Sequence, residues 1–430
     1  MTYAETIEFL YAQLPAYHII GKAAYKDNLH NAEALDKHFG HPHRKYLTIH
    51  VGGTNGKGSV SHIIASVLQQ AGYKTGLYTS PHLKDFRERI RINGEMIDKE
   101  FVVSFVRDNG TILKSLQPSF FEMTVAMAFE YFAVKKVDVA VIEVGLGGRL
   151  DATNIISPAV SVITNIGHDH LALLGDTLEK VAAEKAGIIK RQTPVVIGET
   201  LQTTRNVFIS AAEMSQSEIF FADKNYNLLL DDFDIRSQFR GYSVNERATG
   251  KLFTGVIPLG GDYQKTNLQT VFQIWRCLEA KLNITEQSLT EGIRNVVSNT
   301  GLQGRWQIIR ENPTVICDTG HNPEGLEYVI NQLNKLDVGK RRMVLGFAND
   351  KDVDKVLPLF PKDAVYYFTK ASIPRAMNEN TLKQKAFAAG LRGRSFPSVR
   401  EAYAAALNDS DTSDIIFIGG STFVVAEVLS

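Results

Sequence analysis

The sequence contains little of what marks a secreted, membrane or nucleic-acid-binding protein. Its 430 residues include only two cysteines, Cys277 and Cys317, and no Cys-x-x-Cys or Cys/His zinc spacing, which excludes a disulfide framework and a zinc-finger type of site. No apolar run is long enough to span a bilayer, and the first residues lack the basic start and apolar core of a signal peptide. The 47 basic residues are balanced by 47 acidic ones, so no excess of positive charge indicates nucleic-acid binding. We expect a globular protein of the reducing cytoplasm, without membrane or nucleic-acid partners.

A glycine-rich segment with one lysine follows the first apolar run. Residues 46–51 are apolar and β-branched, residues 52–59 read Gly-Gly-Thr-Asn-Gly-Lys-Gly-Ser, and residues 60–71 form an amphipathic helical pattern. A strand that turns through glycines and a lysine into a helix is typical of polyphosphate binding, because backbone N–H groups, the helix N-terminus and the lysine all attract anionic oxygens. The segment departs from a strict Walker A sequence at Val51 and Gly58. The sequence therefore predicts an ATP-binding loop unlike that of an ordinary kinase or GTPase.

Apolar runs alternate with helical patterns from residue 46 to about residue 200. Runs that are apolar on consecutive residues, such as 139–142, are typical of strands buried on both faces of a parallel sheet. The alternation predicts an α/β fold of βαβ units, with ligands bound beyond the carboxyl ends of the strands. The expected strands are 46–51, 76–78, 137–144, 160–164 and 194–197, and the expected helices lie near 60–71, 121–135 and 177–190.

The pattern changes in the second half of the chain. Strand-like pieces at 217–221, 227–230 and 251–257 predict a small antiparallel sheet without helices over 216–258. Helical patterns at 267–280 and 289–297 are followed by a segment rich in turn-forming residues. Beyond it, the expected strands are 314–318, 342–347, 364–368 and 414–418, with helices near 323–336, 380–389 and 398–408. We expect two domains: 1–297, a P-loop-type domain with a mostly parallel sheet and the small antiparallel sheet, and 298–430, a smaller Rossmann-like α/β domain.

Two polar residues at strand ends are candidate metal ligands. Glu143 ends an apolar strand beside the phosphate loop, a usual place for a carboxylate that holds Mg²⁺ on nucleotide oxygens. The alternative is a glutamate facing water at a sheet edge, but a lone charge in so apolar a strand is costly without a partner. Ser80, after the strand at 76–78, offers the same ion a neutral oxygen. The glycines at 145–148 do not form a dinucleotide fingerprint, because Leu150 stands at the third glycine position.

Other strand ends carry weaker signals. His168, Asp169 and His170 could form a metal cluster, although a helix cap or a surface turn explains their spacing about as well. Asp318 and His321 stand where a strand becomes a helix, and the Asn-Pro pair at 322–323 predicts the N-cap and first residue of that helix. Capping does not explain His321. The residues alone suggest nothing more for Lys185 than a solvated position on a helix.

These motifs together resemble the folylpolyglutamate synthase/dihydrofolate synthase family of the Mur ligase superfamily, nearly from end to end. The sequence departs from the family's usual pattern at residues 319–320, where Thr-Gly replaces the Gly-Ala that is common in the family. This replacement removes no chemical group that the mechanism needs. The resemblance rests on segments in the family's order, several of them family-specific: 53–59, 78–83, 121–122, 143–154, 169–170, 184–188, 304–305 and 318–323.

The resemblance implies a role for each matching residue, with ATP and Mg²⁺ at two sites as cofactors. The nucleotide contacts would be Thr54, Asn55, Gly56, Lys57, Gly58, Ser59, Asn267, Arg305 and Asp318, and the metal ligands Ser80, Glu143 and His170. The wall of the pterin pocket would include Phe121, Glu122, Leu150, Asp151 and Ala152, and His321 and Ser421 would lie near the incoming amino acid. Lys185 matches a lysine that this superfamily carbamylates, and with Lys57 and His321 it completes the expected catalytic residues.

The implied reaction is ATP-dependent amide formation between L-glutamate and a folate through an acyl phosphate. Residues 150–154 resemble those of the bifunctional enzymes, which implies activity on dihydropteroate as well, and the family expectation is a monomer. One alternative is a Mur-type ligase with a non-folate substrate, but such relatives commonly carry an extra N-terminal domain, for which the roughly 45 residues before the first strand leave no room. The other is a nucleotide-binding switch without catalysis, which would not need His321 or the metal ligands.

Overall fold

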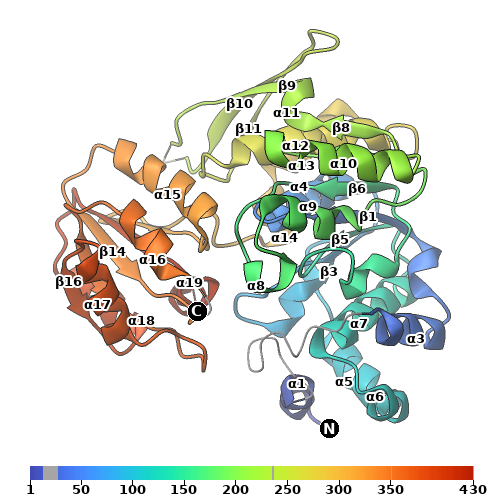
Figure 1. The fold of residues 1–430 in the computed structure, drawn as a ribbon, viewed down its shortest axis with the longest axis horizontal. Coiled ribbons are helices and arrows are strands. Elements are labelled where there is room, and N and C mark those ends of the chain that lie inside the picture. The colour runs from blue at the N-terminus through green and yellow to red at the C-terminus, as the bar shows by residue number, and fades with distance from the viewer. Residues whose placement is uncertain (13–27, 235–236, 350, 430) are drawn as a thin grey trace. The chain divides into compact units, whose positions relative to one another are not determined.

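The computed structural model describes residues 1–12, 28–234, 237–349 and 351–429. The chain divides into two compact units, coloured along the sequence in Figure 1. The first comprises Met1–Leu229, Tyr242–Val256 and Lys265–Gly301, and the second Leu230–Gly241, Ile257–Gln264 and Leu302–Ser430. The second unit thus includes two segments that precede the boundary predicted near residue 298. Within the described ranges, no helix has both the length and the apolar character needed to cross a membrane.

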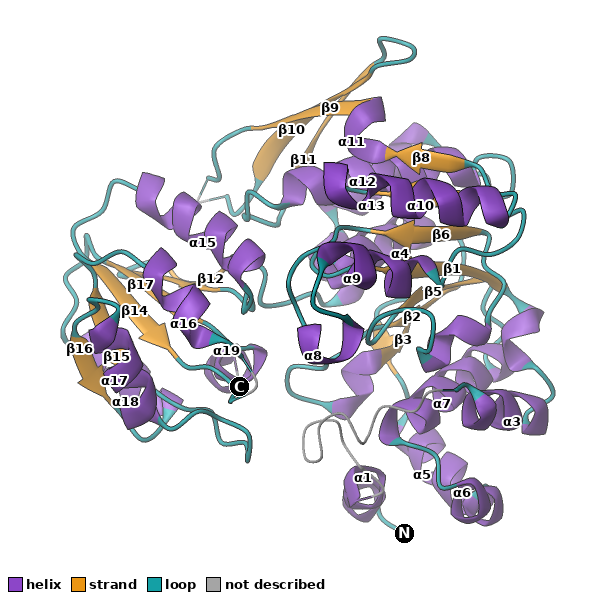
Figure 2. Ribbon diagram, viewed as in Figure 1, coloured by secondary structure: helices purple, strands orange, loops and turns teal. Residues whose placement is uncertain are grey.

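The first unit is built on an eight-stranded sheet in the order β4-β3-β2-β5-β1-β6-β7-β8 (Figure 2). Strands β2, β5, β1, β6, β7 and β8 run parallel, and β3 and β4 extend the sheet antiparallel. The strands are β1 Leu47–Gly52, β2 Thr75–Tyr78, β3 Ile90–Ile92, β4 Glu95–Met96, β5 Val139–Glu143, β6 Val160–Ile163, β7 Val195–Ile197 and β8 Ile219–Phe221. Every residue of β5 and β6 is buried. The prediction of a mostly parallel sheet, buried on both faces, is confirmed.

Helices from several crossovers cover one face of this sheet. Ile142 of β5 and Ser161 of β6 both pair with His50 of β1, so alternate residues of the three strands share that face. There α7 (Phe120–Val134) packs on β5, and α9 (Leu178–Ala186) and α10 (Gln202–Met214) pack on β6 and β7. These helices place Phe121 and Lys185 beside the strand ends. The helices predicted near 121–135 and 177–190 are confirmed.

Helix α4 (Lys57–Gln70) leads out of the glycine-rich loop and is buried continuously from Ser59 to Leu68. It lies against α13 (Glu286–Arg294), where a Cβ on Gly292 would stand only 2.4 Å from the Cα atom of Val67. This packing holds the start of α4, and therefore the loop before it, in place. The other helices of the unit are α1 Tyr3–Ala12, α3 His30–His38, α5 Lys99–Asp108, α6 Gly110–Leu116, α8 Leu171–Leu174, α11 Ala222–Asn225, α12 Gln264–Leu278 and α14 Val296–Thr300, with short 3₁₀ helices at Pro42–Lys45, Phe86–Arg89 and Ala152–Ile155.

The small antiparallel sheet consists of β9 (Tyr226–Leu230), β10 (Arg240–Glu246) and β11 (Leu252–Ile257), in the order β11-β10-β9. The segment 217–221, which the sequence assigned to it, instead contributes β8 to the edge of the large sheet, parallel to β7. The expectation of no helix over 216–258 is also corrected, because α11 makes one turn between β8 and β9. A strand-like sequence identifies a strand but not its partner, and the partner is set by tertiary packing.

The second unit contains a six-stranded sheet in the order β12-β13-β17-β14-β15-β16, in which only β12 is antiparallel. The predicted strands and helices of this α/β unit are confirmed, and β12, β16, α16 and α19 are additions. The strands are β12 Gln307–Arg310, β13 Thr314–Cys317, β14 Arg341–Leu345, β15 Val365–Phe368, β16 Gly393–Ser395 and β17 Ile415–Gly419. The helices are α15 Pro323–Lys335, α16 Val353–Val356, α17 Glu379–Ala388, α18 Val399–Asn408 and α19 Thr422–Leu429, with a 3₁₀ turn at Leu357–Leu359.

Candidate active site

Four neighbouring strands of the large sheet carry the predicted site residues at their carboxyl ends. In the order β2-β5-β1-β6, Ser80 follows β2, Glu143 ends β5, the segment 53–59 follows β1 and the segment 164–170 follows β6. Because these strands are parallel, their carboxyl ends lie at one edge of the sheet. The fold therefore brings together segments that are up to about a hundred residues apart in the sequence.

The glycine-rich loop is fixed by hydrogen bonds to the segment that follows β6. The N–H group of Thr54 donates to the carbonyl of Asn165 at 3.0 Å, and that of Asn55 donates to the Asn165 side-chain oxygen at 2.8 Å. In return, the N–H group of Gly167 donates to the Thr54 hydroxyl at 3.0 Å. Gly56 has φ +83° and is the N-cap of α4, so the loop needs a glycine there. These hydrogen bonds fix the conformation of the glycine-rich loop without any bound ligand.

Asn267 lies against this loop from helix α12. A Cβ on Gly56 would stand 2.3 Å from the Asn267 Oδ1 atom, so the amide directly faces the backbone at the start of α4. Asn267 is buried. Gly58 and Ser59 belong to the first turn of α4, where the Ser59 side chain is buried.

Two lysine ammonium groups meet at one carbonyl of the loop. Lys57 Nζ donates to the carbonyls of Gly53 and Thr54 at 3.1 and 3.0 Å, and Lys185 Nζ donates to the same Gly53 carbonyl at 2.9 Å. Lys185 is only 4% exposed. Burial, and then repulsion from Lys57, lowers the pKa of Lys185 to about 7. The expectation of a solvated helix position is wrong, because the helix turns this side chain toward the loop.

Glu143 and Ser80 are in direct contact. The backbone N–H group of Ser80 donates to Glu143 Oε2 at 2.9 Å, and the Glu143 side chain is buried. A buried carboxylate beside a serine hydroxyl supplies the oxygen ligands that Mg²⁺ prefers, so these residues fit a magnesium ion. Within the described ranges no three His, Cys, Asp or Glu side chains gather as a metal site, so the structure does not support a cluster of the histidines and aspartate at 168–170.

His170 comes from the neighbouring strand end. It has φ +53°, and its N–H group donates to Asp169 Oδ1 at 2.9 Å. The side chain is 27% exposed, and its Nε2 atom lies 3.7 Å from Asp169 Oδ2. A positive φ is costly for a histidine and is kept only where the surrounding structure holds it. The backbone therefore sets the direction of this side chain.

The ring of Phe121 packs on the glycine loop that follows β5. A Cβ on Gly145 would lie 2.3 Å from the Phe121 Cζ atom, and the ring meets Tyr78 edge-on with centroids 6.1 Å apart. The neighbouring Glu122 closes a capping box with the N–H group of Ser119 at 2.6 Å. Phe121 thus faces the Gly145 loop, while Glu122 stabilises the start of α7.

Asp151 shapes the loop from its other end. Its buried carboxylate accepts hydrogen bonds from the N–H groups of Gly145, Leu146 and Thr153 at 3.0, 2.8 and 3.0 Å. Burial raises the pKa of this carboxyl, against the lowering effect of these hydrogen bonds. Leu150 is half-buried beside it, and Ala152 is buried at the start of the 3₁₀ helix Ala152–Ile155.

In the second unit, the end of β13 carries another buried carboxylate. Asp318 accepts hydrogen bonds from the Tyr263 hydroxyl at 2.6 Å and from the N–H groups of Trp306 and Gly320 at 2.8 and 2.7 Å. Burial raises its pKa, although these hydrogen bonds lower it. Tyr263 is a partner that the sequence did not single out; no spacing rule points to it, since the contact joins residues 55 positions apart.

The other predicted residues of this unit gather at the same sheet edge. Arg305 donates to the Thr319 hydroxyl, and His321 Nδ1 lies 3.0 Å from the Thr319 carbonyl. Asn322 caps α15 by accepting from the N–H group of Gly325 at 2.9 Å, which confirms the predicted N-cap. Ser421 follows β17, the parallel neighbour of β13, and is buried.

Comparison with known proteins agrees with this geometry. Residues 51–274 match the Mur ligase middle domain, and residues 304–422 match the glutamate ligase domain of Mur ligases. The chain belongs to the Mur ligase family. It is 33% identical to a folylpolyglutamate synthase of Lacticaseibacillus casei, over 100% of this chain and 98% of the relative.

Solved structures resemble this Mur ligase over its whole length. A Mycobacterium tuberculosis folylpolyglutamate synthase complexed with ADP has a TM-score of 0.89 and 28% identity, covering 99% of this chain and 97% of that one. A bifunctional folylpolyglutamate synthase/dihydrofolate synthase with Mn, AMPPNP and L-glutamate bound has a TM-score of 0.83 and 26% identity, covering 100% of this chain and 97% of that one. The predicted family and fold are confirmed.

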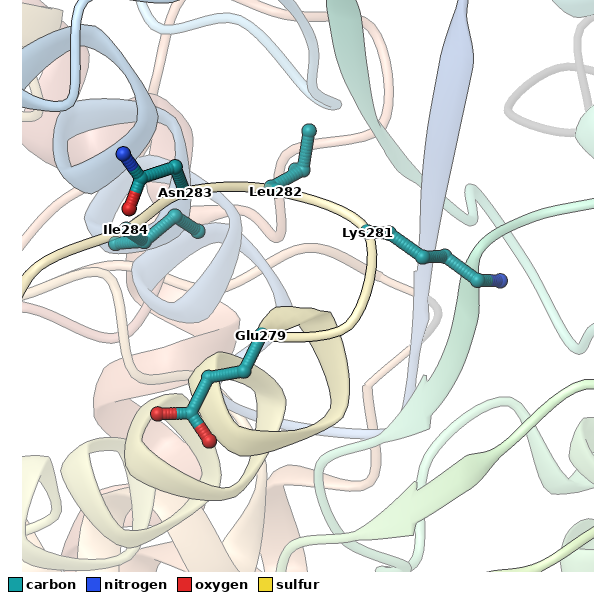
Figure 3. A pocket seen from close by; sticks show the side chains of 5 residues that line it. All are labelled: Glu279, Lys281, Leu282, Asn283 and Ile284. Carbon is teal, nitrogen blue, oxygen red and sulfur yellow. The ribbon is translucent and has the colours of Figure 1, made fainter.

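A surface hollow of this Mur ligase lies away from these residues, in the turn after α12 (Figure 3). The Lys281 ammonium donates to the carbonyl of Ala159 at 3.2 Å, and the Ile284 carbonyl accepts from the Trp275 indole at 2.8 Å. These contacts anchor the turn to the unit. The hollow is lined by Glu279, Lys281, Leu282, Asn283 and Ile284, none of which was predicted for the site.

Proposed function

We propose that this Mur ligase is a folylpolyglutamate synthase that joins L-glutamate to a folate substrate with the hydrolysis of ATP to ADP and phosphate, and that it also accepts dihydropteroate. One observation carries the proposal: the Glu143–Ser80 contact at the sheet edge that also carries the glycine-rich loop and its two lysines. The named relatives, matched over nearly their full length, support the choice of substrates over that of another Mur-type ligase.

The loop and its lysines suit the binding of a triphosphate. Backbone N–H groups at the start of α4 and the Lys57 ammonium attract phosphate oxygens, and Asn267 lies against the same turn. Ser80, Glu143 and His170 would hold Mg²⁺, with a second ion nearby. When bound, the metal supplies positive charge for the oxygens of the transferring phosphoryl group.

The reaction has two steps. A carboxylate oxygen of the folate attacks the γ-phosphorus of ATP, and the bond to ADP breaks, which gives an acyl phosphate. The amine of glutamate then attacks the acyl carbon, loses a proton, and phosphate leaves with the electron pair of the broken C–O bond. Lys57 stabilises negative charge on the phosphoryl oxygens in the first step. For Arg305 and Asp318 we propose nucleotide contacts, and for His321 and Ser421 contacts to the incoming glutamate.

Lys185 suits carbamylation by CO₂. The neutral amine attacks the carbon of CO₂ and releases one proton, which leaves a carbamate anion on Nζ. Burial and the nearby Lys57 ammonium lower the pKa of Lys185 to about 7, so the neutral amine is available at neutral pH. A carbamate there would place an anion beside the Lys57 ammonium, where two cations otherwise share one carbonyl. We propose that this anion helps to hold the second metal ion.

The test is incorporation of radiolabelled glutamate, with dihydropteroate and tetrahydrofolate supplied separately, each with and without ATP. We expect ATP-dependent incorporation with both substrates. Incorporation with tetrahydrofolate alone would restrict the enzyme to polyglutamylation. Nucleotide binding without incorporation into either substrate would refute the proposed function.

A further inference from the structure

A tyrosine donates a hydrogen bond to one of the proposed nucleotide contacts in the second unit. The Tyr263 hydroxyl donates to Asp318 Oδ2 at 2.6 Å. Its ring is half-buried and packs against the hydrophobic core of this unit, which includes Trp306. No motif of the sequence marks Tyr263, so its role has to come from its contacts.

The backbone before Tyr263 is fixed by helix α15. Gln332 of that helix is buried, accepts a hydrogen bond from the N–H group of Asp262 at 2.8 Å and donates to the carbonyl of Gly260 at 2.8 Å. A Cβ on Gly261 would stand 2.4 Å from the Cε1 atom of the Tyr263 ring, so the ring lies directly against this backbone. The hydroxyl therefore has a fixed position within the second unit.

The carboxylate of Asp318 has little freedom to rotate. Oδ2 accepts from the Tyr263 hydroxyl and from the N–H group of Trp306, and Oδ1 accepts from the N–H group of Gly320. A carboxylate has about four acceptor positions, shared equally by its oxygens. The described residues thus occupy both positions on Oδ2 and one of those on Oδ1. The two donors on Oδ2 set the direction in which the last position of Oδ1 points.

The same carboxylate holds the turn that carries Arg305. Gly304 and Trp306 have φ +70° and +48°, so both neighbours of Arg305 are in the left-handed region. This conformation is costly for a tryptophan and is kept only where the surrounding structure holds it. The Trp306 N–H group donates to Asp318 at 2.8 Å. On the other side of the turn, the Gly304 carbonyl accepts from the N–H group of Thr319 at 3.0 Å, and the Arg305 guanidinium donates to the Thr319 hydroxyl. A rotation of the carboxylate would therefore also disturb the arginine.

We propose that Tyr263 is a positioning residue for nucleotide binding, which fixes the Asp318 carboxylate so that its last acceptor position and the Arg305 guanidinium are both presented to ATP. This inference rests on the proposed function, because it takes the nucleotide contacts of Asp318 and Arg305 from it. The hydrogen bond joins a neutral donor to a carboxylate, and such a bond is stronger than one between two neutral groups. Tyr263 thus acts on ATP through Asp318.

The hydrogen bond from Tyr263 also changes the pKa of Asp318. Burial raises this pKa, whereas the hydrogen bond and then the positive charge of Arg305 lower it. Burial and then the charge of Asp318 raise the pKa of the Tyr263 phenol well above its ordinary value, with smaller effects of Arg305, which lowers it, and Cys317, which raises it. The tyrosine therefore stays protonated and donates at neutral pH. Loss of its hydroxyl would raise the pKa of Asp318 further.

The test compares Tyr263→Phe with the control Tyr367→Phe, because each substitution removes one hydroxyl that donates to a carboxylate of the second unit. Tyr367 donates to Asp409 at 2.8 Å and lies on β15, which is not a neighbour of β13. We expect Tyr263→Phe to raise the KM for ATP about 10- to 100-fold, the worth of a hydrogen bond to a charged group, and to leave the KM for the folate substrate unchanged. Tyr367→Phe should keep the wild-type KM for ATP. A wild-type KM for ATP in Tyr263→Phe would overturn the proposal.

A double-mutant cycle with Asp318→Asn separates positioning from a general structural role. If Tyr263 acts through the carboxylate, Tyr263→Phe should change the KM for ATP by no more than about twofold in the Asp318→Asn background. An equal rise of the KM in both backgrounds would mean that the tyrosine supports the unit as a whole. That result would contradict the proposal.

The pH profile gives a second readout that a purely structural role would not move. The acid limb of kcat/KM for ATP should lie at higher pH in Tyr263→Phe than in the wild type, because the lost hydrogen bond raises the pKa of Asp318 and an uncharged carboxyl is a weaker acceptor. Tyr367→Phe should leave the acid limb unchanged. An acid limb of Tyr263→Phe at the wild-type pH would count against the positioning role.

A fluorinated tyrosine at position 263 keeps the proposal testable if Tyr263→Phe does not fold. Its more acidic hydroxyl donates a stronger hydrogen bond, so the acid limb should move to lower pH, and an unmoved limb would refute the positioning role. Calorimetric titration with Mg·ATP repeats these comparisons without ligation, and Tyr263→Phe should bind about tenfold or more weakly. A wild type that joined glutamate to no folate would refute the proposed function, whereas an active wild type with indifferent Tyr263 variants would refute only the role of Tyr263.

Discussion

Replacing Gly56 by alanine tests the phosphate loop against a matched site on the same helix. Gly56 is the N-cap of α4 with φ +83°, and Gly72, just beyond its C-cap Ala71, has φ +89°. A Cβ on Gly72 would meet nothing within 4 Å, whereas a Cβ on Gly56 would stand 2.3 Å from Asn267 Oδ1. The two substitutions therefore share a backbone cost and differ in one contact.

Both variants should lose stability because alanine replaces glycine at a positive φ. An alanine in the left-handed region costs about 1–2 kcal/mol, partly offset by the lower entropy of the unfolded chain. Gly72→Ala should lose about that much stability and keep its nucleotide affinity. Gly56→Ala should lose about 1–3 kcal/mol more, because the buried amide of Asn267 must move away from the added methyl group and a displaced buried polar group is costly. That movement also disturbs the loop beside it.

Urea unfolding and calorimetric titration with Mg·ATP measure the two effects separately. We expect the nucleotide Kd of Gly56→Ala to rise about tenfold or more, the equivalent of about 1.4 kcal/mol, with no change in Gly72→Ala. If both variants lost the same stability and both bound ATP like the wild type, Asn267 would not define the loop. The assignment of this turn to the nucleotide would then be wrong.

Three further substitutions test other parts of the molecule. Glu143→Gln should abolish glutamate ligation and leave the circular dichroism spectrum unchanged, since the amide keeps the volume but loses the charge; normal turnover would contradict the metal assignment. Lys185→Ala should lose activity and regain part of it with added short carboxylic acids, while Lys180→Ala, exposed on the same helix, should stay active; an equal response of the two variants would argue against the carbamate. Asp414→Asn should lose about 3–5 kcal/mol in urea unfolding, because Arg342 stays buried without its partner at 2.8 Å. Burial alone would raise the pKa of Asp414, but hydrogen bonds from Lys340, Asp411 and Arg342 lower it. The ion pair therefore stabilises the fold above the ordinary aspartate pKa, and this stability is lost as the pH falls through the lowered pKa of the folded state. A stability difference between variant and wild type that did not change with pH would count against this account.

The strands that the sequence predicted most directly are apolar or β-branched over most of their length. Strand β5 is buried along its whole length, and a run such as Val-Ala-Val-Ile has few other stable positions in a protein. Strand β16, Gly393–Ser395, was missed because Gly, Arg and Ser have low strand propensity, and its structure comes from pairing with β15. Strand β10 alternates buried and half-buried residues, but Gly241 and Asn245 interrupt the apolar pattern.

The residues of the candidate site were predicted better than their contacts. Motif positions at strand ends selected Ser80 and Glu143, yet the sequence gives no order for the strands. In the sheet, β2 and β5 are neighbours, and this adjacency alone allows the Ser80 N–H group to reach Glu143.

A chain of hydrogen bonds inside the sheet explains why these strand ends keep their relative positions. His50 of β1 lies 2.9 Å, through Nε2, from the hydroxyl of Thr153, and that hydroxyl donates to Asp151 at 2.5 Å. Asp151 in turn accepts from the N–H group of Gly145, two residues after Glu143. Burial, and then the charge of Lys190, lowers the pKa of His50 to about 3, so its ring stays neutral across the physiological range. Strand β1 carries the phosphate loop and β5 carries Glu143, so this buried chain ties the loop after β5 to the strand that presents the nucleotide-binding loop, and neither end can shift without breaking a buried hydrogen bond.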